Sequence, residues 1–187
     1  MKNPALLCLA LIGSNLVVSG VHAPVRSVLH TTSRSSSGGP VGSVSIVIDK
    51  SDYELSVYDD KGWYATYPVV FGNNTLSDKL MEGDKNTPEG VFHIAAKRVH
   101  EKWCRFMSID YPTAEDRQKF NERKRRGEIP ANASIGGGIG IHGVWPHEDF
   151  VVDRYQNWTL GCISMKNEDV TDLYNYTKAG TKVTIRK

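Results

Sequence analysis

Apolar side chains recur at every second position in three early segments of the chain, residues 44–48, 55–57 and 63–69. This period of two is typical of β-strands that bury one face, because successive side chains of a strand point to opposite faces. Polar stretches rich in Asp, Lys, Ser and Gly lie between these segments, at 49–52 and 59–62, where tight turns are expected. The pattern therefore predicts antiparallel strands joined by hairpins.

Two later segments have the composition of helices. Residues 114–126 are dense in strong helix formers, with acidic residues early and basic residues late, which is the order that the helix dipole favours. Residues 167–180 begin with an Asn as a candidate N-cap and end at a Gly. Further strands are expected at 91–96 and 181–185. The predicted fold is mainly β with one or two helices, in the α+β class.

The first 23 residues have the three parts of a signal peptide. Lys2 supplies a positive charge, residues 5–12 are apolar, and residues 21–23 (VHA) offer small side chains at the cleavage positions. A short transmembrane anchor is the alternative interpretation of this segment. The signal peptide over 1–23 predicts an exported protein, either periplasmic or secreted.

The remainder of the chain divides into a linker and one domain. Residues 24–42 are rich in Ser, Thr and Gly and are predicted to form a flexible linker, so that the folded domain covers residues 43–187. The formal net charge of the chain is only +2, which argues against a nucleic-acid binder. Because no internal stretch approaches the ~20 apolar residues of a membrane span, no stable membrane insertion is expected after the signal is removed.

Two cysteines remain outside the signal peptide, Cys104 and Cys162, and in an exported protein such a pair is by default a disulfide. Cys162, however, follows Gly161, and the Gly-rich segment 136–143 contains His142 near its end. A thiol becomes a good nucleophile when a base, most often histidine, takes its proton. The glycine beside the cysteine leaves a backbone N–H free to face an oxyanion. The two residues are therefore candidates for a catalytic dyad.

Several short motifs occur in order along the predicted domain. Sixteen residues, 143–158, separate His142 from the tetrapeptide TLGC at 159–162. Upstream lie residues 87–92 (TPEGVF) and the pair Tyr111-Pro112. This order resembles the L,D-transpeptidase catalytic domain (YkuD-like) of bacterial cell-wall enzymes, whose signature is a His, a spacer and then Ser/Thr-His-Gly-Cys. The similarity runs from about residue 43 to the C-terminus and is closest to the murein-associated branch.

The resemblance implies a β-sandwich of mixed sheets and an acyltransferase with roles in peptidoglycan biosynthesis and cell shape. Cys162 would attack the carbonyl of a meso-diaminopimelate residue in a stem peptide, with His142 as the general base. Gly161, Gly143 and Thr159 would contact the oxyanion or the substrate, and a backbone carbonyl would orient the imidazole. The acceptor would be an amine on a second stem or a wall-anchored protein. No metal or organic cofactor is expected.

Two positions depart from the family pattern. Leu160 replaces the second His, and Ser164 stands where the family often has Arg or Asn. These departures keep two alternatives open: a peptidoglycan hydrolase on the same scaffold (an L,D-carboxypeptidase, an endopeptidase or an amide-cleaving enzyme) and a catalytically silent wall-binding domain. Three aromatic side chains either line a groove beside the site or cap the edge of the sheet: Trp145, Tyr155 and Trp158.

Overall fold

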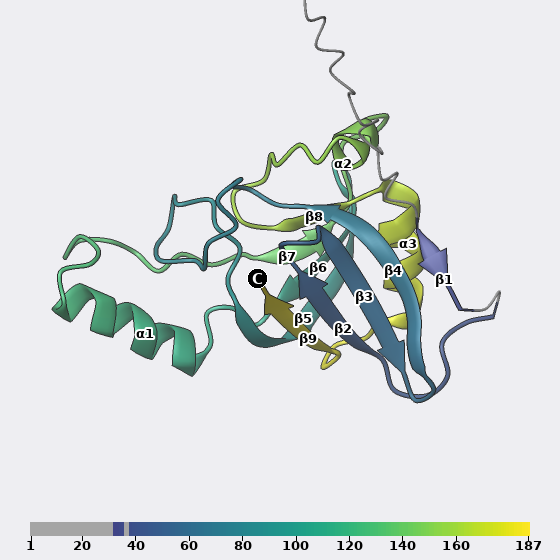
Figure 1. Cartoon of the computed structure of the whole chain (residues 1–187), viewed down its shortest axis with the longest axis horizontal. Helices are drawn as coiled ribbons and strands as arrows, with labels where there is room; N and C mark the ends of the chain where they lie inside the picture. Colours follow the sequence, from purple (N-terminus) through teal and green to yellow (C-terminus); the bar gives the residue numbers. More distant parts are fainter. Residues whose placement is uncertain (1–31, 36–37) are drawn as a thin grey trace, which may run out of the picture.

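A computed structural model describes residues 32–35 and 38–187, and the predicted signal peptide lies outside these residues (Figure 1). The described strands are β1 (Ser33–Arg34), β2 (Ser45–Asp49), β3 (Glu54–Asp59), β4 (Gly62–Val70), β5 (Gly90–His100), β6 (Cys104–Ile109), β7 (Gly140–His142), β8 (Ile163–Met165) and β9 (Lys182–Arg186). The described helices are α1 (Ala114–Arg125), α2 (Phe150–Asp153) and α3 (Asn167–Tyr176).

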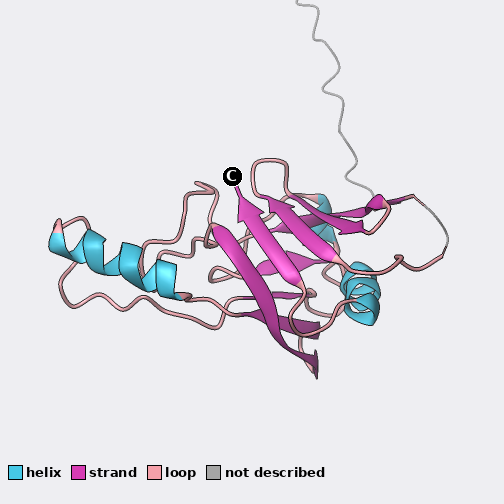
Figure 2. Cartoon of the chain, turned by 90° about the horizontal axis from the view of Figure 1, so that it is seen from below, coloured by secondary structure: helices cyan, strands magenta, loops and turns pink. Residues whose placement is uncertain are grey.

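The strands form one mixed sheet that closes on itself. Their order is β1-β4-β3-β2-β9-β5-β6-β7-β8, and β4 also pairs with β8. The β2–β9 and β7–β8 pairs are parallel, whereas the hairpins β2–β3, β3–β4 and β5–β6 are antiparallel. Because β4 and β5 each pair on both sides of the bend, the sheet folds into two facing layers (Figure 2). The predicted mainly-β fold with mixed sheets is confirmed.

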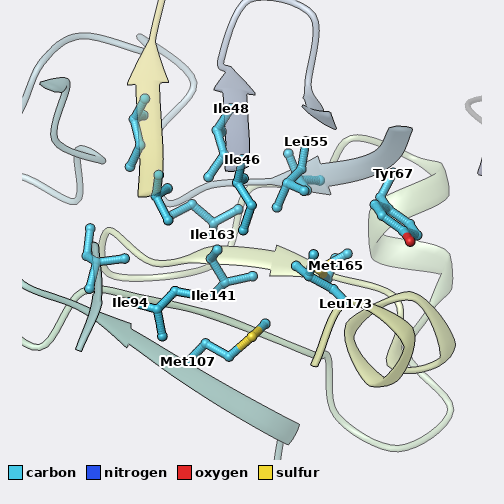
Figure 3. Close-up of a cluster of buried hydrophobic side chains, with 14 of the residues drawn as sticks. Ile46, Ile48, Leu55, Tyr67, Ile94, Met107, Ile141, Ile163, Met165 and Leu173 are labelled. Atoms are coloured by element: carbon cyan, nitrogen blue, oxygen red, sulfur yellow. The ribbon is translucent and has the colours of Figure 1, made fainter. Parts of the chain in front are cut away.

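The space between the two layers holds the hydrophobic core. Ile46 and Ile48 of β2 point toward Ile141 of β7 and Met107 of β6, and all four side chains are fully buried (Figure 3). These are the alternating positions that the period of two predicted, and each such side chain contributes roughly 1.5–3 kcal/mol when buried. The ends of strands β7 and β8, where the candidate residues His142 and Cys162 lie, are thus held by a close-packed core.

Helix α1 lies to one side of the sheet, away from the other helices (Figures 1 and 2). A capping box starts it: the Asp116 N–H donates to Thr113 Oγ1 at 3.3 Å, and the Thr113 N–H donates to the Asp116 carboxylate at 2.8 Å. Phe120 is its buried contact, and Arg123 pairs with Asp78 at 2.9 Å. Within the described residues, no helix is long and apolar enough to cross a membrane.

Both predicted helices are present, and each is shorter than predicted. The helix expected at 114–126 ends one residue earlier. The helix expected at 167–180 ends at Tyr176, because Thr177 has an extended backbone with ψ of 156° and leads toward β9. Helix α2 and strands β6 and β8 were not predicted from the pattern, since they are short or carry no clear alternation.

Part of the predicted linker is structured. Residues 32–35 include β1, which pairs antiparallel with β4. The Thr32 hydroxyl donates to Asp169 at 2.7 Å, and Arg34 pairs with Asp172 at 2.5 Å, so this segment also bonds to α3. The expectation that folded structure starts near residue 43 is therefore wrong at this segment. An exposed edge strand needs no apolar alternation, which explains why the pattern missed it.

Candidate active site

The sheet brings Cys162 and His142 to neighbouring strands. His142 is the last residue of β7, and Cys162 directly precedes β8, which pairs with β7 in parallel. Both side chains line one pocket of about 590 Å³. Nineteen residues lie between the two positions in sequence, and the pairing of β7 with β8 brings them to neighbouring strands.

The walls of this pocket are mostly apolar. Its lining consists of Trp103, Phe106, Gly137, Gly138, Ile139, Trp158, Thr159, Leu160 and Arg98 beside the cysteine and histidine. Trp158 thus lines the groove, as one of the two interpretations predicted. Tyr155 packs edge-on against Tyr53 instead, with ring centroids 5.2 Å apart, and Trp145 does not contribute to the lining.

His142 is oriented by a single backbone hydrogen bond. Its Nδ1 lies 2.6 Å from the Gly143 carbonyl oxygen. Because a carbonyl only accepts, Nδ1 carries the proton in this arrangement, and Nε2 is the acceptor of the neutral imidazole. The expectation that a backbone carbonyl orients the ring is confirmed. The Gly143 N–H in turn donates to the Trp103 carbonyl at 3.0 Å, which fixes the orienting group itself.

Three aromatic rings enclose the imidazole. Trp103 stacks on His142 with centroids 4.7 Å apart, Phe106 lies parallel at 6.1 Å, and Trp158 meets the ring edge-on at 5.6 Å. The side chain is only 2% exposed. Burial lowers the pKa of His142 to about 4, although its bond to the Gly143 carbonyl opposes the shift. The imidazole is therefore neutral at pH 7.

Cys162 is a thiol rather than a thiolate at rest. Burial raises its pKa, while the Gly140 N–H and the charge of Lys79 act in the opposite direction. The thiol donates to the Gly138 carbonyl oxygen, with 3.6 Å between Sγ and oxygen. Because the pKa of the thiol is raised and that of the imidazole is lowered, the pair is neutral rather than ionic before a substrate arrives.

The turn that precedes the cysteine is held by two threonines. Thr159 Oγ1 accepts the Gly161 N–H at 3.1 Å and donates to the Cys162 carbonyl at 2.8 Å. Thr87 donates to the Gly161 carbonyl at 3.0 Å, which joins the upstream TPEGVF motif to this turn. A Cβ at Gly161 would lie 2.9 Å from the Asn86 carbonyl oxygen, and φ there is +131°, so only glycine fits without strain.

These contacts correct the predicted oxyanion residues. The Gly161 N–H is engaged by Thr159 instead of facing the pocket, because the threonine hydroxyl closes the turn. Gly143 is buried behind the imidazole, where a Cβ would meet Asn167 Oδ1 at 2.2 Å. Thr159 lines the pocket, but its hydroxyl faces the turn. Thr159 holds the turn through its hydroxyl, Gly161 takes the backbone conformation that the turn requires, and Gly143 orients the imidazole through its carbonyl.

Three lining residues were not predicted from the sequence: Arg98 of β5, Phe106 of β6 and Trp103 in the turn between these strands. Residues 103–109 (WCRFMSI) show no strict alternation, and their many aromatic and other apolar side chains are the only signal that the sequence offers for a strand there. Leu160, which departs from the family pattern, also lines the pocket and is 76% exposed at the rim.

Neither described cysteine forms a disulfide, so Cys162 carries the free thiol that its assignment as a candidate nucleophile requires. Cys104 lies at the start of β6, with Sγ 3.3 Å from Thr171 Oγ1 on α3. It is held away from the pocket by this contact with the helix.

The described residues form a closed mixed sheet that brings a cysteine and a histidine into one aromatic pocket. The family profile of the L,D-transpeptidase catalytic domain (YkuD) matches residues 43–185, and the chain belongs to this family. No curated protein matches the chain significantly.

Solved structures with the same fold are distant in sequence. Pgp2, the helical cell shape determining protein of Campylobacter jejuni, is 19% identical with a TM-score of 0.56, over 85% of this chain and 51% of that one. Bd1075 of Bdellovibrio bacteriovorus is 21% identical with a TM-score of 0.54, over 78% and 48%. L,D-transpeptidase 3 of Mycobacterium tuberculosis is 15% identical with a TM-score of 0.52, over 78% and 60%. The chain thus spans about half the length of the first two.

Proposed function

We propose that this protein is an exported L,D-transpeptidase that acts on peptidoglycan stem peptides, with Cys162 as nucleophile and His142 as general base. The observation that carries the proposal is the shared pocket, in which the histidine has Nδ1 bonded to Gly143 and Nε2 left as acceptor. Membership of the family supports the reaction class. The proposed partners are a donor stem peptide and an acceptor amine on a second stem or a wall-anchored protein.

The neutral state of the pair determines the order of events. The Sγ proton of Cys162 passes to Nε2 of His142 as the sulfur attacks the carbonyl of a meso-diaminopimelate residue. The S–C bond forms, the C–N bond to the terminal D-Ala breaks, and the proton moves from the imidazole to the leaving amine. An acceptor amine then attacks the thioester, which releases the thiol and forms the new amide.

The tetrahedral oxyanion of these steps needs a hydrogen-bond donor. Since the Gly161 N–H donates to Thr159, the Cys162 N–H is the donor that we assign to this role. Gly161 and Thr159 act by holding that backbone in place, and Gly143 acts by orienting the imidazole. We place no metal or organic cofactor in this route, since each step is a transfer between named atoms of the chain and the substrate.

The test is incubation of the purified protein with disaccharide-tetrapeptide, followed by mass analysis of the products. Cross-linked dimers together with released D-Ala are the expected result, and Cys162→Ala is expected to give neither. Tripeptide monomers alone would assign hydrolysis instead of transfer. Binding of the muropeptide without any turnover would assign a wall-binding domain and overturn the proposed enzyme. Cys104→Ala is the matched control and is expected to retain turnover.

A further inference from the structure

Arg98 lies on the same face of the sheet as His142, two strands away. Arg98 on β5 is the register partner of Phe106 on β6, and Phe106 is the register partner of His142 on β7. Partners in a ladder project to the same face, and neighbouring strands lie about 4.8 Å apart. The Arg98 backbone is therefore roughly 10 Å from that of His142, within reach of a long side chain.

The guanidinium is held over the pocket by stacking. Its central carbon lies 5.2 Å from the centroid of the Phe106 ring. The same ring packs over Gly140 so closely that a Cβ there would lie 2.7 Å from it, and the Gly140 N–H bonds to the sulfur of Cys162. One aromatic ring thus separates the guanidinium from the backbone that contacts the nucleophile.

The Arg98 guanidinium also forms no ion pair or hydrogen bond within the described part of the chain. Among the described residues, no carboxylate pairs with its guanidinium and no carbonyl accepts from it. The neighbouring cations differ: Arg105 donates to the Cys104 carbonyl at 3.0 Å, and Lys97 donates to the Tyr174 and Thr177 carbonyls. Stacked in place without a protein acceptor, the Arg98 fork has its donors free for a ligand.

The pocket that contains Cys162 and His142 also contains Arg98, so a ligand of Arg98 can bind beside the cysteine. Of its described lining residues, Arg98 is the one that carries a full charge at pH 7. Arg98 also borders two adjoining hollows, one of about 390 Å³ over β5 and β6 and one of about 240 Å³ at the end of β5 and the turn that follows it. A single cation in an aromatic pocket fixes the orientation of a bound anionic group, and the geometry of a guanidinium matches a carboxylate.

We propose that Arg98 binds a carboxylate of the peptide whose carbonyl Cys162 attacks, and so determines specificity for anionic over amidated stems. This inference rests on the proposed function. A stem peptide carries carboxylates at its C-terminus and along its length, and either source offers the same planar anion. Hydrogen bonds between charged groups in such a site correspond to a loss of about tenfold to hundredfold in affinity when one partner is removed.

The experiment compares three muropeptide ligands: the tetrapeptide with all carboxylates free, its C-terminal amide, and the analogue amidated at its internal carboxylates. Binding is measured by calorimetry on the full chain carrying Cys162→Ala, and turnover is measured on the chain that keeps Cys162. Each is repeated with Arg98→Gln, which keeps the stem over Phe106, and with Arg98→Lys. Arg105→Gln is the matched control, because its guanidinium also stacks on an aromatic ring, that of Tyr174, but does not line the pocket.

Arg98→Gln is expected to weaken binding of the free acid and to raise its KM about tenfold to hundredfold, with kcat changed less than about threefold. Arg98→Lys restores part of the loss, and Arg105→Gln has no selective effect. If binding of one of the two amidated ligands is no longer weakened by Arg98→Gln, the carboxylate that is amidated in that ligand is the one that Arg98 binds. Equal losses for every ligand, or no loss for the free acid, would overturn the proposal.

The two proposals fail separately in this design. If Arg98-dependent binding is found without turnover, the acyltransferase is wrong and the carboxylate site stands. If turnover is found and Arg98→Gln changes the affinity for the free acid and for the amides by the same factor, the carboxylate site is wrong and the acyltransferase stands. If the protein neither binds nor converts any of the three ligands, both are overturned.

Discussion

Two cysteine–histidine pairs lie on adjacent strands among the described residues, and their surroundings differ. Cys104 and His100 are register partners in the β5–β6 hairpin, yet Cys104 Sγ lies 3.3 Å from Thr171 and the His100 Nδ1 accepts backbone N–H groups of the turn. Cys162 and His142 line one pocket, and the imidazole keeps Nε2 as an acceptor.

The difference shows that proximity of a thiol and an imidazole is not enough for a nucleophilic site. Both atoms must face a space that a substrate can enter, and the ring nitrogen that takes the proton must be free of the backbone. Trp103 stacks between His100 and His142, at 4.4 and 4.7 Å, so the two pairs share a wall. Four measurements test whether the two pairs differ as described.

The largest effect is expected from the cysteines themselves. Cys162→Ala should lower turnover of muropeptide by at least about a thousandfold, because no other group supplies the thioester. Cys104→Ala should retain turnover within about twofold, since its thiol bonds to Thr171 away from the pocket. Rates are measured by chromatography of the products. Equal losses in both variants would contradict the distinction between the pairs.

The second effect is a pH dependence of stability that belongs to His142. Its pKa is about 4 when folded and near 6.5 when unfolded, so the unfolded chain binds the extra proton first as the pH falls. The stabilisation is fully present above pH 6.5 and is lost toward pH 4, by roughly 3 kcal/mol. Urea unfolding of the native chain and of His142→Gln across this range measures the difference.

His100→Gln serves as the control for that measurement. His100→Gln should still lose most of the same stability between pH 6.5 and pH 4. Burial of His142 is the main cause of its lowered pKa, and the charge of His100 is a minor cause. A native chain and a His142→Gln variant with parallel stability curves from pH 7 to pH 4 would show that the imidazole is not held neutral.

The third effect compares the threonines that hold each cysteine. Thr159→Val removes the bonds to the Gly161 N–H and the Cys162 carbonyl, and should cost about 1–3 kcal/mol of unfolding free energy together with part of the turnover. Thr171→Val removes a hydroxyl that bonds to the Asn167 carbonyl within α3, and should cost under about 1 kcal/mol with turnover intact. Thermal melts and rates of both variants decide between these outcomes.

The smallest effect is expected at the rim. Leu160 is 76% exposed, so Leu160→His should change the free energy of unfolding by less than about 0.5 kcal/mol. It places an imidazole where the family pattern has one, and the product ratio between dimer and monomer reports whether that ring affects acyl transfer. A large drop in the melting temperature would show that Leu160 supports the turn through its packing.

The strands with strict alternation were predictable because their pattern is local. Ile46 and Ile48 both point into the core because side chains two positions apart in a strand lie on the same face of the sheet. Helix α1 was predictable from its charge order and composition, and Thr113 with Asp116 adds the cap. Strand β8 was not, since Ile163–Met165 is three residues of buried sheet whose signal is hidden beside the Gly-Cys motif. Residues 32–35 form a strand only because the edge of β4 offers partners.

The candidate site divides in the same way. The order of His142, Thr159, Gly161 and Cys162 is written in the sequence, and so is the glycine whose carbonyl orients the imidazole. Packing alone brings Arg98 and Phe106 into the lining of the pocket. The hydrogen bond from the Gly161 N–H to Thr159 likewise could not be predicted from the sequence.

The sequence alone predicts which segments bury one face and which two side chains are candidates for the chemistry, because periodicity and motif spacing are properties of neighbouring residues. The tertiary structure alone decided what surrounds them. The Thr87 hydroxyl meets the Gly161 carbonyl across 74 positions of the chain, and Phe106 meets His142 through the pairing of β6 with β7. Such contacts leave no local pattern, since they exist only when the closed sheet brings distant segments into register.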